Sequence, residues 1–295
     1  MNRIALGTAQ FGSAYGVSNQ SGQVSEENAR KVISVALTRG VDTVDTAVGY
    51  GDSEAILGRI GANSFHVVTK LPAFPVGVRS VGGWVREQVC LSIERLKIKK
   101  LYGVLLHRPQ DLSGEKGQEL YRSLCEIQKE GMSEKIGISV YHPSELEEWT
   151  GTYSFGLVQA PFNLIDRRLK KSGWLKRLGG EGVELHVRSV FLQGLLLLPH
   201  LSVPPEFARW AGTWRNWQEW LEHNKARALD VCLAYVLSFP EIHRVVVGTD
   251  SPEQLEMILS SEQNWSAGDW PDIESEDEDL ILPYRWNIGR RTTAE

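Results

Sequence analysis

Apolar positions along the chain alternate between short continuous runs and runs at helical spacing. Stretches such as Val104-Leu105-Leu106 and Val245-Val246-Val247 are apolar at every position, which is typical of parallel strands buried on both faces. Between such runs, apolar residues recur at three- and four-residue spacing, which predicts amphipathic helices. The predicted strands cover residues 4–6, 43–45, 65–70, 101–106, 135–139, 156–159, 183–187 and 244–247. The predicted helices cover residues 26–39, 53–60, 85–96, 115–130, 143–149, 167–178, 226–237 and 252–259.

Eight strand–helix units in a chain of 295 residues predict an α/β fold, a (β/α)8 TIM barrel in a single domain over residues 1–262. A hydrophobic content of 42% is sufficient for one large core, either in one barrel or in two smaller domains. No GxGxxG sequence follows the first predicted strand, which disfavours an open doubly wound sheet. A long insertion rich in tryptophan follows the seventh strand (190–225), and an acidic C-terminal tail covers residues 263–295.

The charge balance restricts the classes of partner. The formal net charge is -5, and six acidic residues lie between Asp272 and Asp279, a run that we interpret as a solvated surface segment. Without that run the chain is close to neutral, which argues against nucleic acid as the main partner. The sequence shows no secretory signal and no apolar run of about 18 residues, so we expect a cytoplasmic protein without a membrane span. The three cysteines are widely spaced, which indicates reduced thiols and no metal site.

Polar side chains stand where several predicted strands end. Asp45 ends the second strand, Lys70 the third and His107 the fourth, and Tyr50 follows Asp45 on a loop between two glycines. Taken singly, each has an ordinary structural explanation: a core ion pair, a lysine reaching solvent, a loop histidine or a half-buried aromatic ring. Because the carboxyl ends of the strands converge on the active face of such a barrel, we expect the four to share one pocket. We also expect residues 52–54 to cap the following helix.

These four residue types together suit proton transfer to a carbonyl oxygen. A tyrosine has an ordinary pKa of about 10, and a nearby ammonium group stabilises its anion and lowers that pKa. Lys70 is placed to supply the ammonium group, and the Asp45 carboxylate is placed to hold Lys70. Tyr50 is then a tuned general acid, and the imidazole of His107 can orient the carbonyl oxygen.

The chain resembles the aldo-keto reductases. The resemblance rests on Leu6-Gly7-Thr8-Ala9, on 45–51 (Asp45-Thr46-Ala47-Val48-Gly49-Tyr50-Gly51), and on Val68-Thr69-Lys70. It continues through the segments 105–109, 136–139, 158–164 and 246–255, in the order of the family, over about residues 3 to 260. It implies hydride transfer between a nicotinamide cofactor and an aldehyde or ketone, with Tyr50 as acid, assisted by Lys70, Asp45 and His107.

The resemblance also implies where the cofactor binds. Ser139 and Gln159 match family positions for the nicotinamide carboxamide. The rest of the cofactor would lie over the first strand end and the loop after strand seven, with its phosphates and adenosine at the start of the last helix, where free N–H groups favour anions. The implied cofactor-binding residues are Gly7, Thr8, Asp45, Ser139, Gln159, Arg188, Ser189, Gly248, Thr249, Asp250 and Gln254. The family expectation is NADPH.

Three positions depart from the family pattern. Arg188 stands where many members carry an aromatic residue that stacks on the nicotinamide; its guanidinium can stack, bind an anionic group or pair with an acidic neighbour. Asp250 stands where many members carry a basic residue for the 2′-phosphate of NADPH. An aspartate there disfavours that phosphate and can accept hydrogen bonds from a ribose 2′-hydroxyl, which keeps NADH open as the cofactor. Val140 replaces the usual asparagine after the fifth strand.

The insertion and the tail are the variable parts. Trp210, Trp214, Trp217 and Trp220 recur at positions that share one helical stripe, which predicts packing on the barrel or on a partner, or alternatively an aromatic wall over the substrate. The tail can fold back across the barrel mouth. A monomer is the family default, and the tryptophan stripe is also compatible with a homodimer face.

Three functions follow from these patterns. The first is a carbonyl reductase or alcohol dehydrogenase, acting on a small-molecule carbonyl or alcohol such as a sugar derivative or an aryl aldehyde. The second is a nicotinamide-binding sensor or interaction module with little turnover, suggested by the tryptophan stripe and Val140. The third makes Lys70 a Schiff-base lysine of a barrel lyase, which leaves Asp45 and Tyr50 without clear roles.

Overall fold

Eight parallel strands pair in sequence order and close into a ring in the computed structural model, which describes residues 2–19, 21–261 and 269–286. Each strand pairs with the next, and β8 pairs with β1, with Ile4 opposite Val245 and Gly7 opposite Gly248. The predicted (β/α)8 barrel in a single domain is confirmed. The strands are β1 Ile4–Gly7, β2 Thr43–Asp45, β3 His66–Leu71, β4 Leu101–Leu106, β5 Ser133–Ser139, β6 Leu157–Pro161, β7 Glu184–Arg188 and β8 Arg244–Gly248.

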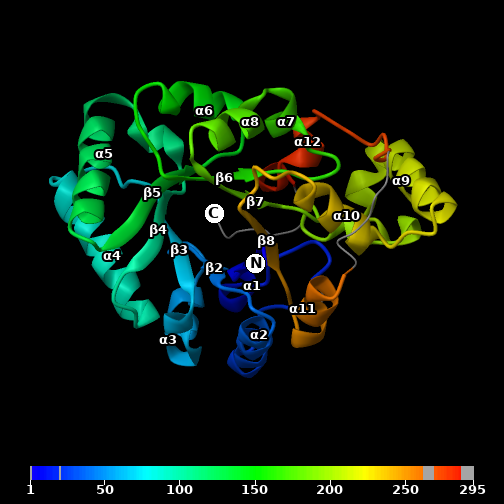
Figure 1. The fold of residues 1–295 in the computed structure, drawn as a ribbon, viewed down its shortest axis with the longest axis horizontal. Helices are drawn as coiled ribbons and strands as arrows, with labels where there is room; N and C mark the ends of the chain where they lie inside the picture. The colour runs from blue at the N-terminus through cyan, green and yellow to red at the C-terminus, as the bar shows by residue number, and fades with distance from the viewer. Residues whose placement is uncertain (1, 20, 262–268, 287–295) are drawn as a thin grey trace.

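Helices surround this ring and cover the outer face of the strands (Figure 1). The longer ones follow the predicted periodicity, and Ser25 caps its helix as such a residue should, accepting a hydrogen bond from the Asn28 amide. The helices are α1 Ala9–Gly12, α2 Glu26–Thr38, α3 Ser53–Ile60, α4 Val81–Leu96, α5 Gly114–Lys129, α6 Pro143–Thr150, α7 Arg168–Lys171, α8 Trp174–Gly180, α9 Ala211–His223, α10 Ala228–Leu237, α11 Pro252–Leu259 and α12 Glu278–Ile281. Short 3-10 turns are η1 Ala62–Ser64, η2 Pro109–Leu112, η3 Leu195–Leu197, η4 His200–Ser202, η5 Pro205–Trp210 and η6 Pro283–Arg285.

The core has two parts. A large apolar cluster fills the space between strands and helices, and a small cluster of Val68, Leu105 and Leu157 is separate from it. Glycine is required beside this small cluster, because a Cβ at Gly137 would lie 1.8 Å from the carbonyl oxygen of Leu157. The absence of a side chain at Gly137 therefore lets β5 and β6 approach closely beneath their carboxyl ends.

Two local predictions were wrong, and one short helix was not predicted. The helix that was not predicted is α1, directly after β1. The helix predicted over residues 167–178 is divided into α7 and α8, because Gly173 adopts a left-handed conformation with φ 82°. The predicted capping of α3 by residues 52–54 is also not found, because Asp52 makes no side-chain capping bond. The Ser53 hydroxyl donates to Thr8 instead. Glu54 accepts hydrogen bonds from Thr69 and Arg95.

The tryptophan-rich insertion packs on itself and on the tail. Trp214 and Trp217 are 3% exposed, and their indole N–H groups donate to the carbonyl oxygens of Phe207 and Leu196. Helix α9 lies at the side of the barrel (Figure 1), and none of the four stripe tryptophans is among the described residues that line the main cavity. The stripe therefore packs within the chain, and the predicted aromatic wall over the substrate was wrong.

The described part of the tail joins the core of the barrel. Leu280, Ile281 and Trp286 are buried, and Trp286 packs edge-on against Phe207 at 4.9 Å between ring centroids. The acidic run is only partly a solvated segment, because its carboxylates pair with basic side chains of α7, η5 and η6. These ion pairs are Lys171 with Glu274 and Glu276, Arg209 with Asp277 and Asp279, and Arg285 with Glu278 and Asp279. Residues 263–268 and 287–295 of the predicted tail lie outside the described residues.

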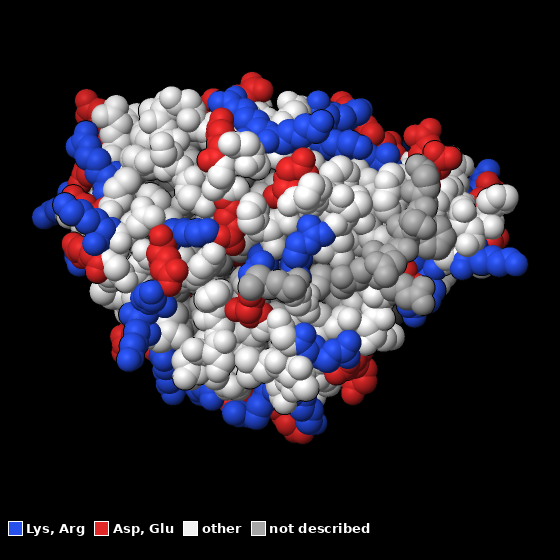
Figure 2. Space-filling view, viewed as in Figure 1, with Lys and Arg blue, Asp and Glu red and all other residues white. Residues whose placement is uncertain are grey.

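Positive and negative side chains are intermingled around the periphery of the face in Figure 2, in keeping with the nearly neutral barrel. No helix in the described ranges is both long enough and apolar enough to cross a membrane.

Candidate active site

A buried ion pair joins the ends of β2 and β3. Lys70 Nζ donates to Asp45 Oδ1 at 2.6 Å and to the Thr46 carbonyl oxygen at 2.9 Å. Gln159 Nε2, from β6, donates to Asp45 Oδ2 at 2.7 Å, so both carboxylate oxygens are occupied. Because the two charged side chains are 1% and 5% exposed, removing either partner would leave an uncompensated buried charge.

Tyr50 and His107 complete the predicted set. Tyr50 lies on the loop between β2 and α3, and its ring centroid is 5.1 Å from Lys70 Nζ. The imidazole of His107, just after β4, lies edge-on to Tyr50 with 6.1 Å between ring centroids. The structure therefore brings all four residues together at the carboxyl ends of adjacent strands, as the sequence predicts.

The electrostatics of the phenol differ from the sequence-based expectation. Burial raises the pKa of Tyr50 above its usual value of 10, the Asp45 carboxylate raises it further, and Arg188 opposes the change. The net lowering expected from Lys70 is not found, because burial of the phenol and the Asp45 carboxylate outweigh the effect of the neighbouring ammonium. Burial likewise lowers the pKa of Lys70, against the attraction of Asp45. Burial, with Lys70 and Arg188 nearby, lowers the pKa of His107 to about 3, so its imidazole is neutral at physiological pH.

A cavity of about 520 Å³ opens above these residues, within the usual range for small-molecule sites. It extends from Tyr50 and His107 to the first turns of α11. Most of the predicted site residues line it: Gly7, Thr8, Asp45, Tyr50, His107, Arg188, Ser189, Gly248, Thr249, Asp250 and Gln254.

Three predicted residues lie behind the cavity wall instead. Lys70, Ser139 and Gln159 are buried and are not among the lining residues that the structure describes. Ser139 Oγ lies 3.4 Å from Gln159 Oε1, and Gln159 is in turn bonded to Asp45. A lysine enclosed in this way is poorly placed to attack a carbonyl, which weakens the Schiff-base interpretation of Lys70.

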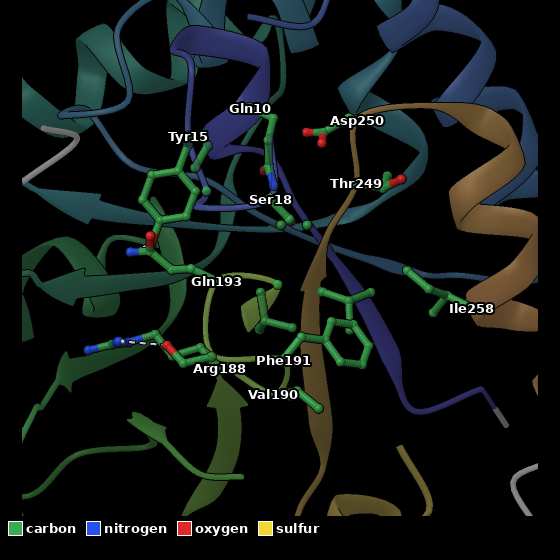
Figure 3. Close-up of a pocket in the computed structure, with 18 of the residues that line it drawn as sticks. Gln10, Tyr15, Ser18, Arg188, Val190, Phe191, Gln193, Thr249, Asp250 and Ile258 are labelled. Atoms are coloured by element: carbon green, nitrogen blue, oxygen red, sulfur yellow. Dashed lines mark hydrogen bonds between the residues drawn. The ribbon is translucent and has the colours of Figure 1, made fainter. Parts of the chain in front are cut away.

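Asp250 marks the opposite side of the cavity from Arg188 (Figure 3). Its carboxylate accepts a hydrogen bond from Asn19 Nδ2 at 3.2 Å, and its backbone N–H donates to Gln254 Oε1 at 2.9 Å. Burial raises the pKa of Asp250. Ser251 caps α11 and accepts a hydrogen bond from the Gln254 amide. The N-terminus of α11 follows the end of β8, and a helix N-terminus of this kind can hold a phosphate.

Several lining residues escaped sequence analysis. Gln10 comes from the short helix α1, and Tyr15, Tyr141, Phe191 and Gln193 come from loops whose side-chain directions no periodic pattern predicts. Tyr15 is a second phenol in the cavity, and Gln193 Nε2 donates to its hydroxyl at 3.2 Å (Figure 3).

The loop after β7 is also strained. Ser189, Leu192 and Gln193 have φ between 47° and 59°, a conformation that costs non-glycine residues about 1–2 kcal/mol each and that clusters at functional sites. Ser189 and Gln193 line the cavity. Gly16 and Gly194, both with positive φ, are a sequence signal for irregular backbone in these loops.

Comparisons with known proteins place this geometry in a family. The profile of the Aldo/keto reductase family matches residues 3–277. An aldo-keto reductase of Mycolicibacterium vanbaalenii is 30% identical over 142 residues, 45% of this chain and 48% of that protein. Aldo-keto reductase str7 of Strobilurus tenacellus is 27% identical over 212 residues, 69% of this chain and 61% of that protein. The matched region thus spans about half to three fifths of the length of these two relatives.

Solved structures share the fold. A holo aldo-keto reductase of Bacillus halodurans superposes with a TM-score of 0.70 at 20% identity, covering 87% of this chain and 85% of that one. A glycerol dehydrogenase of Gluconobacter oxydans superposes with a TM-score of 0.66 at 22% identity, covering 88% and 86%. The closed barrel, the grouped strand-end residues and the match over residues 3–277 agree: this chain belongs to the aldo/keto reductase family.

Proposed function

We propose that this chain is a nicotinamide-dependent oxidoreductase that interconverts an aldehyde or ketone and its alcohol, with Tyr50 as the proton donor. The observation that carries the proposal is the grouping of Tyr50 and His107 at the cavity surface above the Lys70–Asp45 pair. Packing alone does not require a buried ion pair beneath a phenol and an imidazole, since such groups are costly to desolvate.

The charge states suit donation of a proton. The raised pKa of Tyr50 keeps its hydroxyl protonated at neutral pH, so the proton is present to be given to a carbonyl oxygen. His107 is neutral and can donate a hydrogen bond to the same oxygen without carrying charge. Lys70 holds a positive charge close behind the phenol, where it stabilises the phenolate left after transfer. A bound reduced nicotinamide would supply the hydride to the carbonyl carbon.

The cavity residues suit a dinucleotide. Thr8 and Asp45 line the cavity close to Tyr50, whereas Thr249, Asp250 and Gln254 line it at the start of α11. We propose that these residues hold the cofactor, as the family resemblance implies. Ser139 and Gln159 would serve chiefly by fixing Asp45 and the cavity floor, because both are buried behind it.

The Asp250 side of the cavity favours NADH over NADPH in our proposal. Arg188 is the one lysine or arginine among the described lining residues, and it lies across the cavity from Asp250. A carboxylate without a nearby cation repels a 2′-phosphate and accepts a hydrogen bond from a 2′-hydroxyl. This departs from the family expectation of NADPH.

The sensor interpretation is weaker, because Trp214 and Trp217 of the tryptophan stripe that suggested it are buried within the chain. Val140 is likewise buried, at 1% exposure, rather than presented to the cavity. We therefore retain the oxidoreductase as the candidate function.

Tryptophan fluorescence titration and turnover together test this proposal. We expect the wild-type protein to bind NADH more tightly than NADPH and to reduce a panel of aldehydes. Tyr50→Phe should keep the dissociation constant of NADH within about threefold but lower kcat by about 10² or more, as loss of a general acid does. Tyr15→Phe removes another phenol of the cavity and should cost clearly less. A larger loss in Tyr15→Phe, or turnover that survives in Tyr50→Phe, would contradict the assignment of the acid.

A further inference from the structure

Arg188 is an unusual cation for this cavity. It stands at the carboxyl end of β7 and is half-buried in the cavity wall. No carboxylate lies within ion-pair distance of it among the described residues, so the pairing considered from the sequence was wrong. Of the two acidic residues that line the cavity, Asp45 is bound by Lys70 and Gln159, and Asp250 lies on the other side.

The guanidinium is held in position without being neutralised. Arg188 Nη2 donates to the Val140 carbonyl oxygen at 3.1 Å, and Nη1 donates to Ser189 Oγ at 3.4 Å. Its Cζ lies 4.2 Å from the centroid of the Tyr141 ring, and Tyr141 packs edge-on against Tyr284 of the tail at 4.8 Å. A guanidinium has five N–H donors, so these two hydrogen bonds leave donors for a ligand.

The charge of Arg188 acts on the reacting end of the cavity. Arg188 lines the same cavity as Tyr50 and His107. Its charge lowers the pKa of His107 and opposes the rise in the pKa of Tyr50. A small molecule whose carbonyl oxygen meets Tyr50 can therefore reach Arg188 with another of its substituents.

Resting on the proposed function, we propose that Arg188 selects carbonyl substrates that also carry a carboxylate. A planar guanidinium matches a carboxylate through two parallel N–H···O bonds, and this pairing is stronger and more specific than a bond to a neutral group. A half-buried cation without a partner in the wall gains most from a ligand that brings the missing charge. A neutral aldehyde offers no such gain.

Matched acid and ester substrates test this selection. We choose 4-formylbenzoate and its methyl ester, with the 3-formyl isomers to vary the reach from carbonyl to carboxylate. The measured quantity is the discrimination ratio, kcat/KM for the acid divided by kcat/KM for its ester. In the wild type we expect a ratio of at least ten for the better isomer. Arg188→Met should lower the ratio at least tenfold. Arg188→Lys keeps the positive charge but not the two parallel N–H donors, so its ratio should lie between those of the wild type and Arg188→Met.

The control variant is Arg167→Met. Arg167 also stacks on a tyrosine and donates to backbone carbonyl oxygens, with Cζ 5.2 Å from the Tyr235 centroid, but it does not line the cavity. Its ratio should equal that of the wild type. A wild-type preference for the ester, or an unchanged ratio in Arg188→Met, would overturn the inference.

Binding measurements separate this inference from the proposed function. If Arg188→Met weakens NADH binding and slows both substrates equally, Arg188 serves the cofactor and the inference fails. If the wild type binds NADH but reduces no aldehyde, the proposed function fails. Calorimetric titration of benzoate and benzamide into the cofactor-bound protein then still tests the preference for a carboxylate, through the two dissociation constants. Tighter binding of benzoate that is lost in Arg188→Met supports it, and equal binding of the two contradicts it.

Discussion

His107 carries no charge over the physiological range, because burial and two nearby cations lower its pKa to about 3. A neutral imidazole can donate one hydrogen bond and accept another, which a charged one cannot. It also does not add to the positive charge of Lys70 and Arg188 beside the phenol. Burial is the largest cause of the pKa shifts of Tyr50, Lys70 and His107, ahead of any neighbouring charge.

The lowered pKa of His107 predicts a pH dependence of stability. Between about pH 3 and 6.5 the unfolded chain binds a proton at this imidazole that the folded chain does not, so stability falls as pH falls through that window. His107→Gln removes this contribution. We expect its melting temperature to fall less than that of the wild type between pH 7.5 and pH 5. Parallel curves for the two proteins would show that His107 titrates normally in the folded state.

The residues that sequence analysis identified are those whose positions follow from strand order. Asp45, Lys70 and His107 end successive strands, so topology alone brings them together. Tyr15 and Gln193 sit on irregular loops, where side-chain direction depends on dihedral angles that no pattern encodes. The direction of the Tyr50 pKa shift was also beyond prediction, because it depends first on how deeply the phenol is buried and then on the Asp45 carboxylate.

Among the elements, α1 packs closely against the loop that carries Tyr50. A Cβ on Gly12, the last residue of α1, would lie 1.6 Å from the carbonyl oxygen of Tyr50. A Cβ on Gly51 would lie 2.5 Å from the Gly12 carbonyl oxygen, and Gly51 also has φ +52°. The two glycines therefore let the backbone at the end of α1 touch the backbone of the loop that carries Tyr50.

We expect Gly12→Ala to displace Tyr50 and so to lower kcat more than tenfold, with a loss of stability of about 1–3 kcal/mol, as overpacking does. Gly180→Ala in α8 is the matched control, since a Cβ there meets nothing within 4 Å. Both variants are compared by aldehyde turnover and by thermal melting. Equal activity of the two variants would mean that the loop contact does not position Tyr50.

Helical periodicity predicted the longer elements and failed for the short ones. Helices α2, α4 and α5 have broad apolar stripes, whereas α1 has four residues and no room for a repeat. The stripe in α9 was real, but the pattern alone does not identify the surface that covers it. That surface is supplied by the insertion and by a tail distant in sequence.

Across the whole molecule, the candidate site lies at the carboxyl ends of the strands, and a network of charged side chains lies at their amino ends. At the amino ends of the strands, Glu184 accepts hydrogen bonds from Tyr102 and His186 and pairs with Lys135. Burial opposes the ionisation of Glu184, but these three partners hold its pKa below the usual range. This network lies at the opposite ends of the strands from Tyr50. In such barrels the active site lies at the carboxyl ends, so we expect this network to serve stability.

Glu184→Gln should lower the free energy of unfolding by roughly 2 kcal/mol, somewhat less than for a fully buried pair, because Lys135 is partly exposed. The value of kcat/KM should not change. Glu134→Gln is the control, since its exposed pair with Lys100 contributes little. Denaturant unfolding and aldehyde turnover measure the two effects. A drop in kcat/KM for Glu184→Gln in the folded protein would contradict the separation.

Closure of the ring by β1 and β8 has a consequence for how the chain assembles. The first strand emerges from the ribosome almost a whole chain before the strand that covers its second edge. Arg3 reinforces this last junction, because its guanidinium donates to the carbonyl oxygens of Leu237, Phe239 and Ile242 at the end of α10. Contacts between such distant segments are slow to form, since the loop between them must first be closed. Assembly of the barrel is therefore completed only after synthesis of the eighth strand.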